Sequence, residues 1–444
     1  MLAKLTDEQY KGGENFDLHQ MLLMGKNLRL GERTGYFSSM LTEIAARGEQ
    51  LHMRRILSGA DRSVIVEDPT TGRKRSMLMF GSNNYLGLAS HPSVKESAGQ
   101  ALREYGAGVG GPPLLNGYTA LHRELEERLA ALKGCESAML FSSGYGANVG
   151  LVTALVNQRD RVLYDAYSHA SFCDGIKMAD VQSRHFPHND IDRMEKMLEA
   201  CSGADHDVFV GVEGVYSMDG DLAPLDRLTR ICRERGAILL LDDAHGSGVM
   251  GRTGRGSAEH FGVEGLVDIT MGTFSKTFAT TGGFIASTGP IIEYLRYFAR
   301  SYMFSASLPP VVAATVIAGL DVIEREPELI ARLHDNVAYA AAGLNLLGFD
   351  LSPEGAIIPL AVPPGMNIRK AARRFHEKGI FVNSVEFPAV PLSQQRFRVS
   401  LMATHTREDI DRLIDAVGEV WPESAKESSL EEQQSETEIV RHEH

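Results

Sequence analysis

The chain has 444 residues, of which 43% are hydrophobic and 23% charged, a composition typical of a globular protein large enough for two unequal domains. Its formal net charge of -13 argues against a nucleic-acid partner, because binding to phosphates needs a basic surface. The 4 cysteines form no CxxC pair, which disfavours a metal site or a disulfide framework and favours a reducing, cytoplasmic location.

Residues 1–75 are predicted to form a helical segment followed by a hairpin. Residues 16–57 carry apolar side chains at helical spacing, among them Leu18, Met21 and Ile44. Residues 63–67 and 76–80 flank a turn that contains Pro69 and Gly72, which predicts a β-hairpin.

Residues 106–111 match the letters of a GxGxxG motif, but the context excludes a dinucleotide site. The motif follows a helix that is predicted to begin near Ser93, whereas the dinucleotide fingerprint follows a strand. Pro112 and Pro113 stand where the motif should open a helix.

Residues 76–305 are predicted to form a large α/β domain. Helices are expected at residues 122–133, after Gly144, at 190–200 and at 225–235, and strands at 138–142, 161–164, 208–212, 237–241 and 267–271. Alternation of this kind predicts a mainly parallel sheet with helices on both faces.

The remaining residues are predicted to form a smaller α+β domain, residues 306–421, and an acidic disordered tail, residues 422–444. Helices are expected at 311–325, 327–347, 367–378 and 406–420, and strands at 357–362, 380–383 and 397–401. The tail has hardly any apolar residues, so it cannot bury enough surface to offset the entropy of ordering. The N-terminus shows no apolar signal core, and the longest apolar stretch is too short to span a bilayer, which leaves peripheral membrane contact possible.

Two of the predicted strands end in polar residues that predict an active site. Asp242, Asp243 and His245 follow residues 237–241, and Thr273, Ser275 and Lys276 follow residues 267–271. Ligands of open α/β sheets bind beyond the carboxyl ends of the strands. A partly desolvated Lys276 would have a lowered pKa and could form a Schiff base with a carbonyl, of which pyridoxal phosphate is the commonest.

A pyridoxal phosphate site also needs an acid facing the ring nitrogen and an anion cradle. Either Asp242 or Asp243 could be the acid, since successive side chains of a strand point to opposite faces and spacing does not choose between them. Residues 142–148 follow a strand and open a helix, which favours binding of a phosphate.

The other groups that such a site needs are a flat partner for the ring and a carboxylate binder. His169 is a candidate to stack on the ring, although a structural role is the commoner one for a lone histidine. Arg396 and Arg398 share one face of a predicted strand and could bind a carboxylate, or could be exposed strand residues.

The sequence from about Phe80 to Val420 resembles the α-oxoamine synthases, which are fold-type-I pyridoxal phosphate enzymes. The resemblance rests on SNNYLGL, SSGYGAN, DAYSHAS, EGVYSMDGD, LDDAHGSGVMG, GTFSKTF, FSASLPP and RFRVSL, which occur in the order of the family. It implies a large, mainly parallel seven-stranded sheet domain, a smaller C-terminal domain, pyridoxal 5'-phosphate as cofactor and a homodimer with a shared active site.

The resemblance also implies a role for each matching residue. Lys276 would be the Schiff-base lysine, Asp242 the partner of the ring nitrogen and His169 the stacking imidazole, and His245 would be the fourth catalytic residue. His245 and Ser217 would contact the phenolic oxygen, whereas Gly144, Tyr145 and Thr273 would bind the phosphate. Asn83 and Arg398 would bind the carboxylate of the substrate, and Ser305 and Ser307 would reach the phosphate site of the second subunit.

The implied reaction is a decarboxylating Claisen condensation of serine, glycine or alanine with an acyl-CoA or an acyl carrier protein, giving a 2-amino ketone. GTFSK, the turn from Leu115 to Gly117 and FSASLPP are most similar to the serine palmitoyltransferase branch. Members of the family commonly carry a Ser/Thr-Arg pair near the substrate, where this chain has Pro112 and Pro113. In such a family the N-terminal helical stretch has three candidate roles: lining an acyl-chain tunnel, touching a membrane surface, or packing at a dimer interface. Another synthase of the family, an aminotransferase and a catalytically silent partner subunit remain as alternatives, although silence would leave Lys276 and Asp242 free to change.

Overall fold

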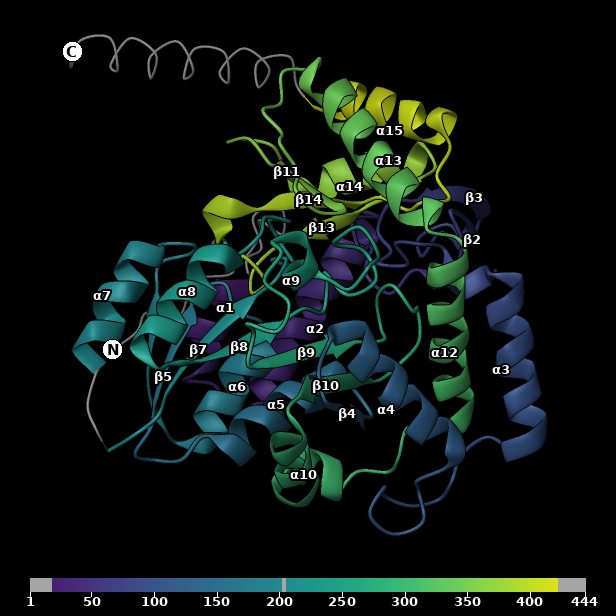
Figure 1. Cartoon of the computed structure of the whole chain (residues 1–444). Helices are drawn as coiled ribbons and strands as arrows, with labels where there is room; N and C mark the ends of the chain where they lie inside the picture. The colour runs from purple at the N-terminus through teal and green to yellow at the C-terminus, as the bar shows by residue number, and fades with distance from the viewer. Residues whose placement is uncertain (1–17, 202–204, 422–444) are drawn as a thin grey trace, which may run out of the picture.

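The computed structural model describes residues 18–201 and 205–421 and is organised around a seven-stranded sheet (Figure 1). The strands lie in the order β4 (Ser137–Phe141), β10 (Gly283–Ser287), β9 (Ile269–Thr273), β8 (Ile238–Asp242), β7 (Val208–Glu213), β5 (Arg161–Asp165) and β6 (Gln182–Phe186). Only β10 runs antiparallel to its neighbours, β4 and β9. The prediction of a mainly parallel sheet is confirmed.

Helices cover both faces of this sheet because its strands are apolar on both sides. In β8, Leu240 belongs to the core under α5 (Gly144–Leu155), α6 (Ala170–Ala179) and α10 (Gly289–Phe298). Its neighbours Leu239 and Leu241 belong to the core under α7 (Ile191–Cys201) and α8 (Leu225–Arg235). Alternation of side chains along a strand therefore supplies two separate cores.

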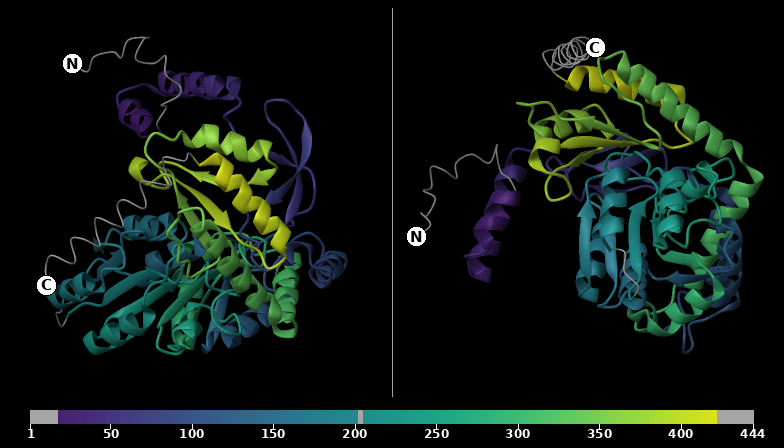
Figure 2. Two further views of the ribbon diagram at one scale, coloured as in Figure 1. Left: turned by 90° about the horizontal axis from the view of Figure 1, so that it is seen from above. Right: turned by 60° about the vertical axis from the view of Figure 1, so that its left-hand side comes forward.

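A third core joins the sheet to the C-terminal part of the chain. It is built on α3 (Pro92–Tyr105), α4 (Ala120–Lys133), α12 (Pro310–Arg325) and α13 (Glu328–Asn345). The C-terminal part contains a three-stranded antiparallel sheet in the order β11 (Ile357–Ala361), β14 (Arg396–Ser400) and β13 (Asn383–Val385). This sheet lies above the large sheet, together with α13, α14 (Ile368–Glu377) and α15 (Arg407–Val420) (Figure 2). The predicted α+β character of this part is confirmed.

The predicted N-terminal hairpin forms and extends the C-terminal part. It consists of β2 (Ser63–Glu67) and β3 (Lys74–Met79), with β1 (Arg55–Ile56) on its outer side and β12 (Ile380–Phe381) parallel to β3. The domain limits at residues 75, 305 and 421 stay predictions. The predicted disordered tail lies outside the described residues.

The helical prediction for residues 16–57 is correct only in part. Residues 18–46 contain α1 (Leu18–Gly25) and α2 (Leu30–Ala46), which extend along one side of the C-terminal part (Figure 2). The helix ends before Gly48, which adopts a left-handed φ of 70° and stops helix propagation. Residues 16 and 17 lie outside the described ranges.

Several elements of the large sheet region were not predicted, among them α6, α10, β6 and β10. β6 is an edge strand with the polar sequence QSRHF, so it lacks the apolar pattern of a strand. β10 begins at the second residue of the pair Gly282-Gly283, which resembles a loop signal. No helix in the described ranges is long and apolar enough to cross a bilayer.

Candidate active site

The polar residues that follow the strands meet in one cavity of about 290 Å3 at the carboxyl edge of the sheet. Its lining includes six of the predicted site residues: Gly144, Tyr145, His169, Asp242, Thr273 and Lys276. The parallel arrangement of the strands explains this convergence, since carboxyl ends of parallel strands lie on one side. The predicted location of the site is therefore supported by the geometry.

Lys276 follows β9 and lies inside this cavity. Burial lowers the pKa of the Lys276 amine to about 8, although the nearby carboxylates of Asp242 and Glu213 oppose the change. A substantial fraction of the amine is therefore neutral near pH 8 and able to react with an aldehyde.

The structure separates the two adjacent aspartates by environment. Asp242 lines the cavity, where its carboxylate accepts hydrogen bonds from Asn148 Nδ2 at 2.8 Å and from the Ala244 N–H at 3.1 Å. Asp243 is 1% exposed and lies 2.7 Å from Lys133 Nζ. Asp242 is therefore the carboxylate that can face a ligand in the cavity, and Asp243 belongs to a buried ion pair.

Asp243 is further bound by two serines. Its carboxylate accepts hydrogen bonds from Ser257 Oγ at 2.7 Å, from the Ser257 N–H at 3.2 Å and from Ser247 Oγ at 3.2 Å. These bonds and the ammonium of Lys133 compensate a buried charge. Sequence reasoning missed Lys133 because its partner is distant in the chain.

A hydrogen-bond chain connects His169 with Asp242. His169 Nδ1 lies 2.7 Å from Ser171 Oγ and accepts the Ser171 N–H at 3.2 Å. Asn148 Nδ2 then donates to Ser171 Oγ at 2.9 Å as well as to Asp242. Burial lowers the pKa of His169, and this effect outweighs the negative charge of Asp242, which raises the pKa. The imidazole is therefore neutral and suited to stacking.

The start of α5 provides the anion cradle. Ser143 is the N-cap, and its Oγ accepts the Gly146 N–H at 2.9 Å, which leaves the first N–H groups of the helix directed at the cavity. A Cβ on Gly144 would lie 2.8 Å from Thr273 Oγ1, so only glycine fits between α5 and β9. Amine, carboxylate and anion cradle thus line one cavity, and these residues fit pyridoxal phosphate.

Tyr145 lies at the cavity, whereas the two serines predicted to reach the second subunit lie outside it. Tyr145 is half exposed at the cavity, and its hydroxyl donates to Asp174 Oδ2 at 2.6 Å. Ser305 and Ser307 do not line the cavity of their own chain, and the Ser307 N–H donates to the Gly111 carbonyl at 3.0 Å.

The remaining predicted residues form a second network around Arg398. Arg398 donates to Asn83 Oδ1 at 2.9 Å and to the Ser217 carbonyl at 2.5 Å, and it is 3.4 Å from the hydroxyl of Tyr85. The same hydroxyl is 2.8 Å from His245 Nδ1. Burial, aided by the charges of Lys276 and Arg398, lowers the pKa of His245 well below its usual value, so its ring is neutral.

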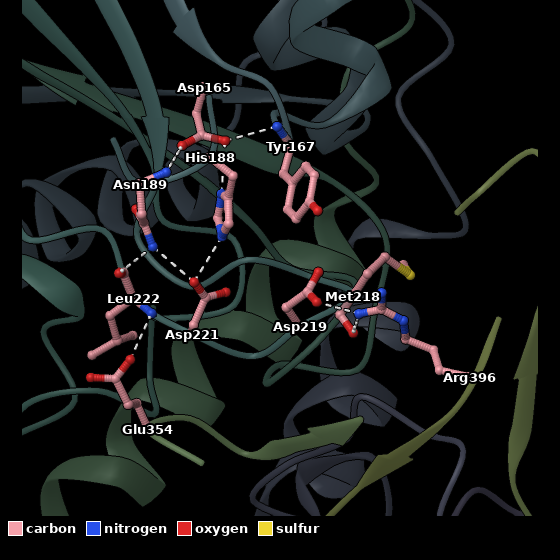
Figure 3. Close-up of polar contacts among 10 residues, drawn as sticks. All are labelled: Asp165, Tyr167, His188, Asn189, Met218, Asp219, Asp221, Leu222, Glu354 and Arg396. Atoms are coloured by element: carbon pink, nitrogen blue, oxygen red, sulfur yellow. Dashed lines mark hydrogen bonds and ion pairs between the residues drawn. The ribbon is translucent and has the colours of Figure 1, made fainter. Parts of the chain in front are cut away.

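Only one of the two candidate arginines faces this network. Arg396 forms an ion pair with Asp219 and donates to the Met218 carbonyl at 3.4 Å (Figure 3). Arg398 instead lies beside Asn83 and lines a neighbouring apolar cavity. The geometry therefore favours Arg398 as the carboxylate-binding residue.

Glu213 is a cavity residue that sequence reasoning missed. It ends β7, is 3% exposed, and its Oε1 has no hydrogen-bond partner among the described residues. Burial, reinforced by the charge of Asp242, raises the pKa of Glu213 well above its usual value. The sequence signal that could have identified Glu213 as a site residue is its position as a carboxylate at the end of the apolar run VFVGVE.

Comparison with known proteins identifies the class. The family model for aminotransferase class I and II matches residues 75–417. The chain is 40% identical to a serine palmitoyltransferase of Bacteriovorax stolpii over 79% of this chain and 83% of that protein. It is also 40% identical to an 8-amino-7-oxononanoate synthase of Geobacter sulfurreducens over 86% of this chain and 97% of that protein.

Two further relatives support the match. A "4-hydroxy-2,2'-bipyrrole-5-methanol synthase PigH" of Serratia sp. is 41% identical over 78% of this chain, but the chain spans only 53% of that protein. The solved structure of the Sphingomonas wittichii serine palmitoyltransferase has a TM-score of 0.83 and 32% identity, covering 88% of this chain and 97% of that chain.

The chain belongs to the aminotransferase class I and II family, whose fold is that of the fold-type-I pyridoxal phosphate enzymes. Within that family it is an α-oxoamine synthase, a pyridoxal-phosphate-dependent acyltransferase. The predicted family, fold class, cofactor and enzyme type are confirmed.

Proposed function

We propose that the protein condenses serine with a long-chain acyl-CoA to give 3-ketosphinganine, the reaction of a serine palmitoyltransferase in sphingolipid biosynthesis. The observation that carries this proposal is a cavity of about 440 Å3 between α2 and the C-terminal sheet. Its apolar lining includes Phe37, Leu41, Ile44 and Val385, and Arg398 lies at the same cavity. An alkyl chain would be buried there next to the residue that binds the amino acid.

The charged residues of this cavity favour an uncharged acyl chain. Arg369 Nη2 lies 2.7 Å from Glu386 Oε2, and both side chains are largely buried. An acyl chain that ends in a carboxylate would need a cation, and Arg369 is already neutralised. This argues for serine palmitoyltransferase activity over the alternative 8-amino-7-oxononanoate synthase. The cavity volume of about 440 Å3 argues against 2-amino-3-ketobutyrate CoA ligase, which acts with a short acyl group.

Each residue that lines the cavity at the carboxyl edge of the large sheet would have a separate role in the reaction. Pyridoxal phosphate, when bound, supplies an aldehyde that links to amines and a ring that accepts electrons from the substrate Cα. Asp242 would hold a proton on the ring nitrogen, and the neutral ring of His169 would pack on one face of the cofactor. Gly144, Tyr145 and Thr273 would hold the phosphate.

The substrate-side residues would orient the amino acid and move its proton. Arg398 and Asn83 would bind the carboxylate and thereby place the Cα–H bond near Lys276. The Lys276 amine, with a pKa of about 8, would accept the Cα proton. Ser217 and His245 would contact the phenolic oxygen of the cofactor.

We also propose a cytoplasmic homodimer in which Ser305 and Ser307 contact the phosphate site of the second subunit. Two observations support this arrangement: neither serine lines the cavity of its own chain, and Ser305 is only partly buried. The N-terminal helices α1 and α2 expose Leu22, Leu23 and Leu30, which suits a packed interface or a membrane surface.

A substrate matrix tests the proposed reaction. The purified holoenzyme is mixed with serine, glycine or alanine and with palmitoyl-CoA, an ω-carboxyacyl-CoA or acetyl-CoA, and the released thiol is measured. We expect the fastest release with serine and palmitoyl-CoA, and mass spectrometry should detect the 2-amino ketone. Preference for the ω-carboxyacyl or acetyl donor would contradict the proposal, and amino-group transfer without thiol release would indicate an aminotransferase.

A further inference from the structure

His188 connects two carboxylates: Asp165 at the end of β5, and Asp221 in the loop that follows β7 (Figure 3). Its Nδ1 lies 2.9 Å from Asp165 Oδ1, and its Nε2 lies 2.8 Å from Asp221 Oδ2. Ionised carboxylates only accept hydrogen bonds, so both ring nitrogens donate and the ring is an imidazolium. No sequence motif pointed to this histidine, which follows the edge strand β6.

The first carboxylate controls the segment that carries His169. Asp165 ends β5 and is 0% exposed, and it also accepts the N–H of Tyr167 at 2.8 Å and of Asn189 at 2.9 Å. His169 is the N-cap of α6, four positions after Asp165. The path of residues 166–169 is therefore set by bonds to Asp165.

The second carboxylate closes the segment that carries Ser217. Asp221 Oδ2 accepts a further bond from Asn189 Nδ2 at 2.8 Å, and its carbonyl accepts the Tyr216 N–H at 2.9 Å. Residues 216–221 thus form a loop whose end is tied to His188 and Asn189. Asn189 adopts a left-handed φ of 52°, which lets its backbone and side chain reach both carboxylates.

Aromatic rings from the same two segments enclose His188. Its ring stacks on Tyr167 with centroids 4.1 Å apart and meets Tyr216 edge-on at 4.4 Å. Tyr167 and Tyr216 both line a cavity of about 670 Å3 that also includes Ser217. A cation between two aromatic rings gains additional stabilisation.

The charge of His188 follows from these neighbours. Burial lowers its pKa, but the hydrogen bonds and charges of Asp165 and Asp221 outweigh burial and raise the pKa to about 9. Tyr216, which also faces the ring, stays protonated because burial raises its pKa well above the usual value. The same two segments meet once more at Glu213, whose charged form is favoured by the N–H groups of Ser217 and His169.

We propose that His188 is a positioning residue that clamps the segments 166–169 and 216–221 together and so holds His169 and Ser217 against the cofactor. The proposal rests on the cofactor contacts proposed above for these two residues. His188 itself does not line the cofactor cavity, so it acts through its two carboxylate partners. The clamp holds while His188 is protonated.

The test compares His188→Gln with His185→Gln in the full-length holoenzyme. His185 lies three residues earlier on β6 and is exposed, and its ring meets that of Tyr164, which lies outside both segments. Glutamine at position 188 removes the charge and can bind only one carboxylate well. We expect about tenfold or more weaker reconstitution with pyridoxal phosphate and a reduced circular dichroism band of the bound cofactor, whereas His185→Gln should behave as wild type.

A pH titration provides a second measurement that does not depend on the folding of that variant. The pKa of His188 is raised in the folded state, so the clamp is complete below about pH 6.5 and is lost as the pH rises through about 9. Asp221→Asn removes one carboxylate, so the cofactor band should disappear at lower pH in this variant than in wild type.

The proposal of a clamp would be overturned by two results together. His188→Gln and His185→Gln would bind the cofactor equally well, and the cofactor band would have the same pH midpoint in wild type and in Asp221→Asn. These measurements need no amino acid or acyl donor, so they hold for any substrate. A His169→Ala variant with an unchanged cofactor band would contradict the proposed role of His169 instead, which keeps the two failures distinguishable.

Discussion

The adjacent residues Asp242 and Asp243 should respond to the same substitution in opposite ways. Asp243→Asn leaves the Lys133 ammonium, 4% exposed and 2.7 Å away, without a counter-ion. Loss of one partner of a buried ion pair costs about 3–5 kcal/mol. The asparagine oxygen can take the place of Oδ1 and keep both bonds from Ser257, so we expect the lower end, about 3 kcal/mol less free energy of unfolding.

Asp242→Asn should leave stability nearly unchanged and remove activity. Asn148 Nδ2 and the Ala244 N–H bind different oxygens of Asp242, so the single amide oxygen keeps one of these two bonds. Loss of the other bond should lower the free energy of unfolding by about 1 kcal/mol. The lost charge is the one proposed to keep the ring nitrogen protonated. Removal of one preorganised electrostatic group lowers rates by about 100- to 1000-fold, and we expect that loss in kcat/KM.

Urea unfolding followed by circular dichroism and thiol release with saturating cofactor separate the two effects. Arg230→Gln, which breaks the exposed 3.8 Å contact between Arg230 and Glu234, is the stability control and should change nothing measurable. If Asp243→Asn stays as stable as wild type but loses activity, while Asp242→Asn stays active, the assignment of the two carboxylates is wrong.

Three further predictions concern the same site. Binding of pyridoxal phosphate to cofactor-free protein, followed by stopped-flow absorbance, should accelerate as the pH rises through about 8, because only the neutral Lys276 amine reacts. Continued acceleration up to pH 10 would show that the pKa of Lys276 is not lowered. Arg398→Lys loses paired hydrogen bonds to the substrate carboxylate, so KM for the amino acid should rise about 10- to 100-fold in steady-state assays, with unchanged KM contradicting its role. Gly144→Ala places a Cβ 2.8 Å from Thr273 Oγ1, so cofactor affinity should fall about tenfold in a fluorescence titration, and normal affinity would refute the close approach.

Much of the fold could be predicted because its elements have strong local patterns. The buried strand β8 reads as a continuous apolar run, and α8 begins and ends where its apolar spacing begins and ends. Elements without such patterns were missed. β6 is an exposed edge strand of polar residues, and its place in the sheet depends on backbone pairing with β5.

The residues of the site also divide into those with a local sequence signal and those without one. Lys276, Asp242 and the α5 cradle stand directly after apolar strands, so their positions could be read from the chain and their roles from the family resemblance. Asn148, Glu213 and His188 have no such signal, because their importance comes from partners that lie far away in the sequence.

The sequence by itself determined the parallel sheet, the edge at which the chemistry occurs and the kinds of group that meet there. Spacing left each ambiguous pair open and the family resemblance implied one member, but only the tertiary structure gives the physical reason for the choice. Asp243 is taken by Lys133 and Arg396 by Asp219, which leaves Asp242 and Arg398 for ligands. Alternation along a strand puts Asp242 and Asp243 on opposite faces and puts Arg396 and Arg398 on the same face. In both pairs, the side chain that meets a cavity depends on packing between segments distant in the chain.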